Sequence, residues 1–396
     1  MVVPMRDKPQ FGGEIPWIRI EDLDGKYVSD SKTGQNVSDE TILRMGLKVF
    51  PRGTVLCSCS CRMGTTAIVD KPLVSNQTFI GVLPGRELSS EFLYYALQAA
   101  SENLQSTATG AIQQYLSRDD FQRLRLRAPG IAHQVAIASF LDNEVSKIDA
   151  LLNKKIRLID LIAEKRSATI QRAVTQGLNP DAPSVESRIN WLGRIPSHWR
   201  VIPLKLLSGI QSGITVGKKH SREQILIARP YLRVANVQDG YLSLQDISSI
   251  DVPLSEVQRY ELRPGDVVVT EGGDFDKLAR GYVWEGEIEG CLHQNHIFAV
   301  RPIQSRLRSR FLAALMTSNY GRNYFTATSV QSTNLACTNR FKLGGFPVPL
   351  PPPEEQASIC RWLDNSAAQI QTATEKLGAT IDRLREYRSE GVLRSV

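Results

Sequence analysis

The sequence predicts an α+β fold in which two copies of one unit, a globular domain followed by a long helix, stand one after the other. Three observations lead to this prediction. Residues 131–174 form one uninterrupted helical pattern, the pattern recurs 222 residues later, and strand-and-turn motifs occur twice, once before each helical stretch. Repetition at a fixed offset is typical of an internally duplicated fold.

Residues 131–174 contain neither Gly nor Pro and are rich in Leu, Ile, Ala, Lys and Glu, which favours a helix. Such a helix would be roughly 66 Å long at about 1.5 Å per residue. Its apolar residues alternate at spacings of four and three, as in a coiled-coil seam, with Lys155 as a polar interruption. A seam this narrow requires a partner helix.

The partner helix stands in the same chain, because residues at the offset of 222 match, among them Gln134 with Gln356 and Asp142 with Asp364. Short connections favour antiparallel pairing of the two helices, with the globular domains at opposite ends and a pseudo-twofold axis between them. The seam residues that we expect to hold the two helices together are Leu141, Ile148, Leu152, Ile159, Ile370, Leu377, Ile381 and Leu384.

The globular parts repeat as well. Residues 16–25 resemble residues 230–240, and residues 50–56 resemble residues 262–268, where a turn with Pro and Gly precedes a run of β-branched residues. Residues 191–207 have no counterpart at the front of the first copy. We therefore expect the first domain to lack one N-terminal element.

Segments with Pro and Gly at residues 177–183 and 347–353 mark the domain boundaries. The predicted organisation is a first globular domain at 1–129, a first helical spacer at 130–178, a second globular domain at 179–350 and a second helical spacer at 351–396.

Composition is that of an ordinary water-soluble protein, with 42% hydrophobic and 22% charged residues. No apolar run approaches the roughly 20 residues of a membrane span, and the N-terminus lacks the apolar core of a secretory signal. We expect a cytoplasmic protein without a membrane partner. A formal net charge of +7 favours an anionic partner such as nucleic acid, although basic proteins of many kinds share such an excess.

Motifs of catalysis or metal binding are weak. No phosphate-binding loop, dinucleotide fingerprint or nucleophile elbow is present. Cys57, Cys59 and Cys61 alternate as they would on a strand, so we interpret them as small buried thiols rather than metal ligands. His293 and His296 lack a third ligand, and we interpret them as strand and turn residues. The sequence thus predicts no catalytic residue and no metal site.

Clusters of cations in predicted loops are the candidates for DNA contact. Lys and Arg can hold phosphates, and Arg beside Asn or Gln can read the edges of purine bases. For any single residue, solvent-exposed charge without a partner is the alternative. The candidate DNA-binding residues are Lys218, Lys219, His220, Arg222, Lys277 and Arg280 in the second domain, and Arg52, Arg62, Lys71 and Arg118 in the first.

Four motifs give the chain a resemblance to a known family. They are residues 12–17 (GGEIPW), 163–167 (AEKRS), 195–199 (IPSHW) and 349–356 (PLPPPEEQ). In their order and duplication they resemble the specificity (S) subunit of type I restriction–modification enzymes. The first copy departs from the pattern, since residues 129–134 read PGIAHQ where the Pro-Pro-x-x-Glu-Gln pattern is expected.

The resemblance implies a protein without catalysis of its own. Two target-recognition domains would each read one half of a split site in double-stranded DNA, and the helical spacers would fix the half-site separation. The spacers would also dock two modification (methyltransferase) subunits, which bring S-adenosylmethionine, while restriction subunits add ATP- and Mg-dependent translocation and cleavage. The alternatives are a coiled-coil adaptor with protein-binding globular ends, a stand-alone adenine methyltransferase, and a truncated, inactive specificity subunit.

Overall fold

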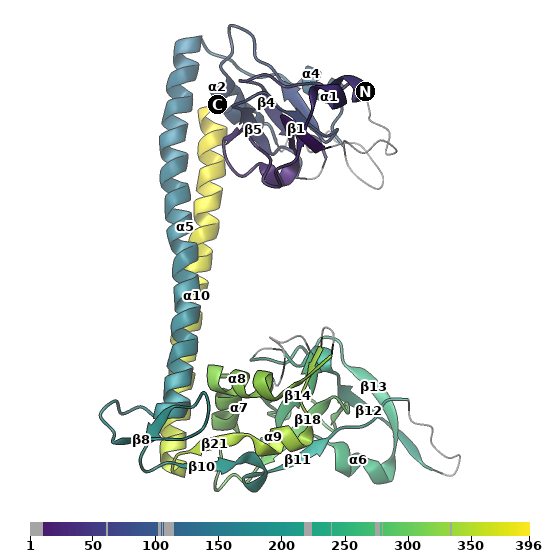
Figure 1. The fold of residues 1–396 in the computed structure, drawn as a ribbon, viewed down its shortest axis with the longest axis vertical. Helices are drawn as coiled ribbons and strands as arrows, with labels where there is room; N and C mark the ends of the chain where they lie inside the picture. The colour runs from purple at the N-terminus through teal and green to yellow at the C-terminus, as the bar shows by residue number, and fades with distance from the viewer. Residues whose placement is uncertain are drawn as a thin grey trace. The chain divides into compact units, whose positions relative to one another are not determined.

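The computed structural model in Figure 1 describes residues 11–60, 62–101, 104, 106, 115–217, 224–238, 240–273, 278, 280–332 and 335–396. Packing divides the chain into two units, and the division falls inside both long helices. Unit 1 comprises Met1–Arg157 with Leu377–Val396, and unit 2 comprises Leu158–Lys376. Each unit therefore holds one globular domain and one part of each long helix, α5 (Ile131–Gln176) and α10 (Pro353–Ser395). The domain boundaries proposed from the sequence stay a prediction.

Unit 1 has strands and short helices in its globular part. They are β1 (Phe11–Ile18), η1 (Ile20–Asp22), β2 (Tyr27–Val28), β3 (Asn36–Val37), α1 (Asp39–Met45), β4 (Val55–Ser58), β5 (Thr66–Val69), β6 (Val74–Ser75), β7 (Phe79–Val82), α2 (Ser90–Ala99) and α4 (Arg118–Arg123).

Unit 2 has more strands. Its elements are β8 (Ser184–Glu186), β9 (Arg194–Pro196), β10 (Arg200–Pro203), η2 (Leu204–Leu206), β11 (Ser208–Ser212), β12 (Leu226–Leu232), η3 (Val234–Asn236), β13 (Ser248–Pro253), α6 (Leu254–Tyr260), β14 (Val267–Thr270), β15 (Gly272–Gly273), β16 (Gly281–Val283), β17 (Leu292–His293), β18 (Ile297–Pro302), α7 (Ser309–Thr317), α8 (Asn319–Thr328), β19 (Val330–Ser332), β20 (Leu335–Cys337), α9 (Arg340–Gly345) and β21 (Pro347–Leu350).

Strand pairing confirms the internal repeat. In unit 1, β1 pairs antiparallel with β3 and parallel with β6, and in unit 2 β12 pairs in the same two ways with β13 and β17. A second sheet has β4 between β5 and β7, and its counterpart has β14 between β16 and β18. The two globular domains are therefore copies of one α+β topology.

The turn before the central strand is the same in both units, as the sequence predicts. The amide of Gly53 (φ 85°) donates to the Val69 carbonyl at 2.8 Å, and that of Gly265 (φ 90°) donates to the Trp284 carbonyl at 2.7 Å. Both glycines need the left-handed backbone region, which other residues rarely adopt. The Pro and Gly residues in the sequence thus predicted correctly the turns that precede the equivalent strands β4 and β14.

Buried apolar residues fill each sheet and the helix that covers it. In unit 1, Val55 and Cys57 of β4 pack with Leu93 and Leu97 of α2, all at most 2% exposed. Cys57 and Cys59 are fully buried, which confirms the prediction for these two thiols, and burial raises the pKa of Cys57 to about 12. Cys61 lies outside the described residues.

The helix predicted at residues 131–174 is confirmed as α5, and α10 runs antiparallel to it within each unit (Figure 1). In unit 1, Asp149 of α5 accepts a 2.8 Å hydrogen bond from Nε of Arg388, and Leu141 packs in one cluster with Val392. In unit 2, Ile170 and Val174 of α5 pack with Ile359, Cys360 and Leu363 of α10.

The predicted seam residues face inward. Leu141 and Ile381 are buried, and the others are half-buried: Ile148, Leu152, Ile159, Ile370, Leu377 and Leu384. Lys155, the polar interruption, is half-buried as well.

A buried glutamine fixes each helix to its globular domain with the same three hydrogen bonds. Gln356 is fully buried. Its Oε1 accepts from the Arg308 amide at 2.9 Å, and its Nε2 donates to the carbonyls of Arg306 and Pro351, both at 2.9 Å. In unit 1, Gln134 accepts from the Ser89 amide and donates to the carbonyls of Glu87 and Pro129. Because buried amides need partners, each glutamine is tied to this position.

Two of the family motifs meet at one junction in unit 2, beside Gly177 at the end of α5. The Glu355 carboxylate accepts from Nε1 of Trp199 at 3.1 Å and pairs with Nε2 of His198 at 2.8 Å. A Cβ on Gly177 (φ 77°) would stand 3.1 Å from the Glu355 carboxylate and 3.3 Å from the Trp199 ring. The motifs therefore join the end of α5 to the start of α10. His133 occupies the place of Glu355 in the first copy.

Among the described residues, no helix combines the length and the apolar character needed to cross a membrane.

Candidate nucleic-acid interface

Arg52 and Lys71 lie at one end of the β4–β5 pair in unit 1, and each pairs with a carboxylate. Arg52 lies 3.3 Å from the Asp70 carboxylate, and Lys71 lies 3.6 Å from that of Asp30. All four side chains are at least 43% exposed. Exposed pairs of this kind are weak, so a phosphate could replace either carboxylate at small cost.

Arg62 lies in the turn at the opposite end of β4 and β5, with φ at 53°. Four-residue strands span about 13 Å, so the structure does not bring Arg62 to Arg52 and Lys71. Arg62 instead borders a cavity of about 770 Å³ between the sheet, α2 and the unit 1 ends of the two long helices.

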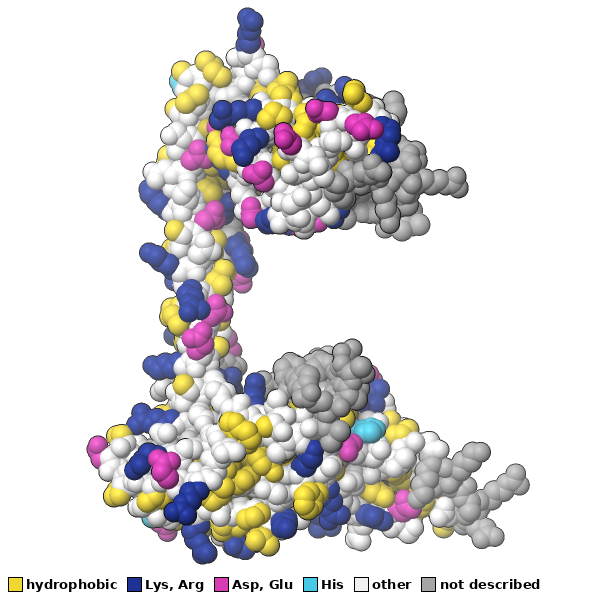
Figure 2. All heavy atoms as spheres, in the orientation of Figure 1, with side chains coloured by type: hydrophobic (Ala, Val, Ile, Leu, Met, Phe, Trp, Pro, Cys, Tyr) yellow, Lys and Arg dark blue, Asp and Glu magenta, His cyan; other side chains and the backbone are white. Residues whose placement is uncertain are grey.

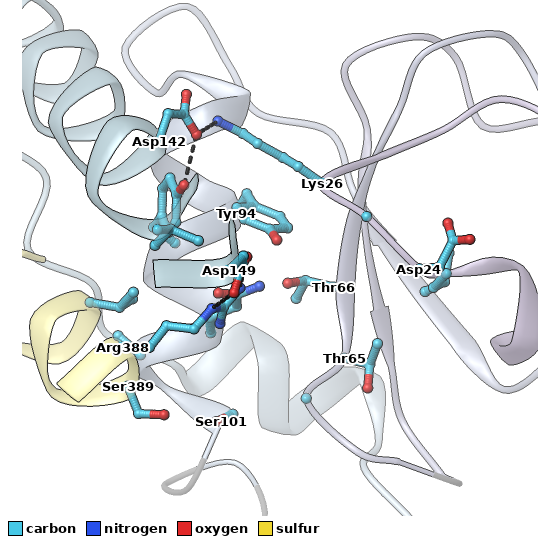
Figure 3. Close-up of a pocket in the computed structure, with 18 of the residues that line it drawn as sticks. Asp24, Lys26, Thr65, Thr66, Tyr94, Ser101, Asp142, Asp149, Arg388 and Ser389 are labelled. Carbon is cyan, nitrogen blue, oxygen red and sulfur yellow. Dashed lines mark hydrogen bonds and ion pairs between the residues drawn. The ribbon is translucent and has the colours of Figure 1, made fainter. Parts of the chain in front are cut away.

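Inside this cavity the charges compensate one another (Figure 3). Lys26 pairs with Asp142 of α5 at 2.5 Å, and Asp142 also accepts from the Tyr95 hydroxyl at 2.7 Å. Burial raises the pKa of Tyr95, so that hydroxyl keeps its proton and donates. In unit 2 the corresponding Asp364 pairs with Arg310 at 2.8 Å. In each unit, an Asp of a long helix thus pairs with a cation of the globular domain. The unit 1 cavity therefore lies where the domain is attached to the helices, and we do not interpret it as a phosphate site.

Arg118 is exposed at the first position of α4, a helix capped by the Ser117 hydroxyl. The helix is at the same repeat position as α9, where Arg340 replaces Arg118 and Asn339 replaces the cap. Both arginines therefore stand at equivalent places, at the first position of α4 and of α9.

In unit 2 only one of the predicted DNA-binding residues lies within the described residues. The others, Lys218, Lys219, His220, Arg222 and Lys277, lie outside them. Arg280 follows β15, and one of its guanidinium nitrogens is 3.5 Å from Oε1 of Gln238. Arg can form two hydrogen bonds to a guanine edge, and Gln can form two to an adenine edge.

Glu271 and His296 stand beside Arg280, and sequence reasoning missed this grouping. The Thr270 amide donates to the Arg280 carbonyl, and the Glu271 amide donates to the His296 carbonyl at 2.9 Å. The Glu271 carboxylate lies 2.7 Å from Nδ1 of His296, which is 57% exposed. No local pattern could have shown this, because β14, β16 and the turn before β18 come together only in the folded sheet.

His293 and His296 occupy different environments, as strand and turn residues do. His293 ends β17, is buried, and its Nδ1 lies 2.9 Å from the Tyr260 carbonyl, whereas His296 is exposed. Burial lowers the pKa of His293, so the ring is neutral at pH 7.

Comparison with known proteins agrees with these features. Residues 3–160 match the family model of the type I restriction modification DNA specificity domain. The chain is 30% identical over 151 residues to the MjaIX specificity subunit of Methanocaldococcus jannaschii, which covers 37% of this chain and 34% of that protein. It is 22% identical over 384 residues to the StySPI specificity subunit of Salmonella potsdam, covering 93% of this chain and 79% of that protein.

Solved structures show the same fold. The HsdS subunit from Thermoanaerobacter tengcongensis matches with a TM-score of 0.50 and 16% identity, covering 88% of this chain and 81% of that one. A chain from a structure of complex assembly and conformational transition of the type I R-M system matches with a TM-score of 0.61 and 18% identity, covering 88% of this chain and 82% of that one.

The chain spans 34% and 43% of the length of the two archaeal relatives, MjaIX and MjaX. From the domain match and the long alignments together, the chain is similar to the specificity subunits of type I restriction enzymes over most of its length.

Proposed function

We propose that this chain is the DNA sequence-recognition subunit of a type I restriction–modification complex, with no catalysis of its own. Each globular domain reads one half of a split target, and the paired helices set the separation between the half-sites. The observation that carries the proposal is the duplication: two domains with the same strand pairing are attached to the helices by the same buried glutamine. A duplicated reader suits a two-part DNA site.

Base reading in unit 2 is assigned to the cluster formed by Gln238, Glu271, Arg280 and His296. Together these side chains offer donors for guanine and adenine edges and a carboxylate that can accept from the amino group of cytosine. Lys218, Lys219, His220, Arg222 and Lys277 supply phosphate contacts. In unit 1, Arg52, Lys71 and Arg118 have the same role, which positions the domain on the duplex without reading sequence.

The outer faces of the helix pair dock two methyltransferase subunits. Apolar residues outside the seam support this: Leu151 and Ile156 in unit 1 are 42% and 43% exposed, and Leu158 and Leu161 in unit 2 are both 44% exposed. Exposed apolar residues at helical spacing are suited to a partner helix. S-adenosylmethionine belongs to these partners, and ATP and Mg belong to the restriction subunits.

The test is reconstitution of the full chain with its modification subunits, followed by methylome sequencing and gel-shift measurements. Methylation should fall on adenines of one split sequence, and the complex should prefer that site over random DNA. A folded complex without any preference for a split site would overturn the proposal. Adding one helical turn to both α5 and α10 should change the accepted spacer and leave both half-sites unchanged.

A further inference from the structure

Unit 2 carries an exposed apolar surface that includes none of the residues assigned above to DNA contact. Three apolar side chains are solvent-exposed on it: Leu206 of η2 is 55% exposed, Ile303 after β18 is 46% exposed, and Phe341 of α9 is 86% exposed. With the cations Lys205, Arg306 and Arg340 they make up the Phe341 patch. Single exposed apolar residues are common on soluble proteins, whereas several gathered on one surface mark an interaction site more often.

The three segments of the Phe341 patch are neighbours, although they are far apart in sequence. The Ile303 amide donates to the Leu207 carbonyl at 2.9 Å, and Arg306 donates to the Leu206 carbonyl at 3.1 Å. Helix α9 packs on η2, since a Cβ on Gly344 would stand 3.3 Å from that of Lys205. The patch is therefore one surface.

This surface is built from chain segments without acidic residues. Residues 187–222 and 290–353 contain no Asp or Glu and seven Lys or Arg each, although Asp and Glu make up 41 of the 396 residues. The fold brings the two segments together, because β11 pairs with β18 and β10 pairs with β21. Among the described acidic side chains, none forms an ion pair with Lys205, Arg306 or Arg340.

Figure 2 agrees with this distribution. On the visible face of unit 2, where α9 and β10 lie in Figure 1, hydrophobic side chains stand among Lys and Arg side chains, with few Asp or Glu between them.

The fold itself does not require these residues. In unit 1, α4 occupies the position of α9, and the residue 222 positions before Phe341 is Asp119. Asp120 likewise stands where unit 2 has Lys342. Both short helices are capped in the same way, by Ser117 and Asn339. The exposed Phe is therefore particular to the second domain, although Arg340 has Arg118 as its counterpart in the first.

We propose that the Phe341 patch binds an acidic polypeptide segment of a partner protein. The segment places an apolar side chain against Phe341 and Leu206, and its carboxylates against Lys205, Arg306 and Arg340. A polypeptide fits better than DNA, because the apolar side chains of the patch offer phosphates no partner. Protein interfaces have an apolar core and a polar rim, whereas DNA interfaces are more polar and much more positively charged. The proposal does not depend on the proposed DNA recognition.

A random peptide library displayed on phage tests the proposal on the full chain, with selection in parallel on Phe341→Ala. The peptides enriched only on the unsubstituted chain should combine an aromatic or aliphatic anchor with Asp or Glu. Truncation of Phe341 should weaken the best peptide by about tenfold, as at a binding hot spot. The double variant K205Q/R340Q should weaken it several-fold and flatten its salt dependence.

Phe140→Ala is the matched control, because Phe140 on α5 is also a largely exposed phenylalanine, at 58%, and lies in unit 1. It should leave the peptide affinity unchanged, and thermal melting should show all variants folded. Random-sequence duplex DNA is measured on the same variants. The proposal is overturned if no selected peptide depends on Phe341, if the dependent peptides lack Asp and Glu, or if Phe341→Ala weakens the duplex and not the peptide.

Discussion

Replacing Gln356 by Leu should lower the free energy of unfolding of unit 2 by about 3 kcal/mol. Leu keeps most of the volume of Gln but makes none of its hydrogen bonds, which go to the Arg308 amide and the Arg306 and Pro351 carbonyls. The site is fully buried, so water cannot replace the lost partner. A buried group without a partner costs about 1–3 kcal/mol, and the low end of this range for each group gives about 3 kcal/mol in total.

Urea unfolding followed by Trp fluorescence measures this loss. Four of the five tryptophans, Trp191, Trp199, Trp284 and Trp362, belong to unit 2, so the signal reports mainly on that unit. Gln369→Leu is the matched control, because Gln369 is an exposed residue of the same helix, where the change should stay within about 0.5 kcal/mol. If the two variants lose equal stability, the buried glutamine does not fix α10 to its domain. Hydrogen exchange at the Arg308 amide should also become faster in Gln356→Leu alone.

Three further predictions concern the motif junction, the thiols and the DNA contacts. Gly177→Ala should destabilise unit 2 by about 1–2 kcal/mol, because Gly177 has a positive φ and lies close to the Glu355 carboxylate and the Trp199 ring. The control Gly391→Ala, inside α10, should be neutral or stabilising. Equal melting temperatures of the two variants would contradict this prediction. After treatment with iodoacetamide at pH 8, mass spectrometry should find the exposed Cys337 modified. Cys57 should stay unmodified, because burial raises its pKa to about 12. Rapid labelling of Cys57 would show that the core around it is open to solvent. Changing both residues of the Lys218–Lys219 pair to Gln should weaken DNA binding for all sequences and lower the salt slope by about 0.9 per lost phosphate contact; an unchanged slope would remove this loop from the phosphates.

The sequence predicted the long elements and the duplication because both are encoded by patterns that can be read locally. The absence of Gly and Pro over residues 131–174 predicts the continuous α5, and the offset of 222 predicts its antiparallel partner. Gly53 and Gly265 predict equivalent turns, since a left-handed backbone favours Gly wherever it occurs. Cys57 and Cys59 were predicted as buried because alternate positions of a strand share a face.

The candidate DNA contacts could be predicted only as residue types in loops. Sequence gave no sign that Arg52 and Lys71 pair with carboxylates, or that Arg62 borders a different surface, because the partners are distant in the chain. The grouping of Arg280 with Glu271 and His296 likewise depends on which strands become neighbours in the sheet.

By itself, then, the sequence determined two α+β domains, two long helices and the residue classes that could meet DNA, because helical periodicity and turn chemistry act over a few residues. Only the tertiary structure decided how these parts are joined. Gln356 could be recognised as a repeat position, but its three partners lie in segments up to 50 residues away. The Phe341 patch arises in the same way, since strand pairing between distant segments places an exposed ring among cations that no local pattern connects.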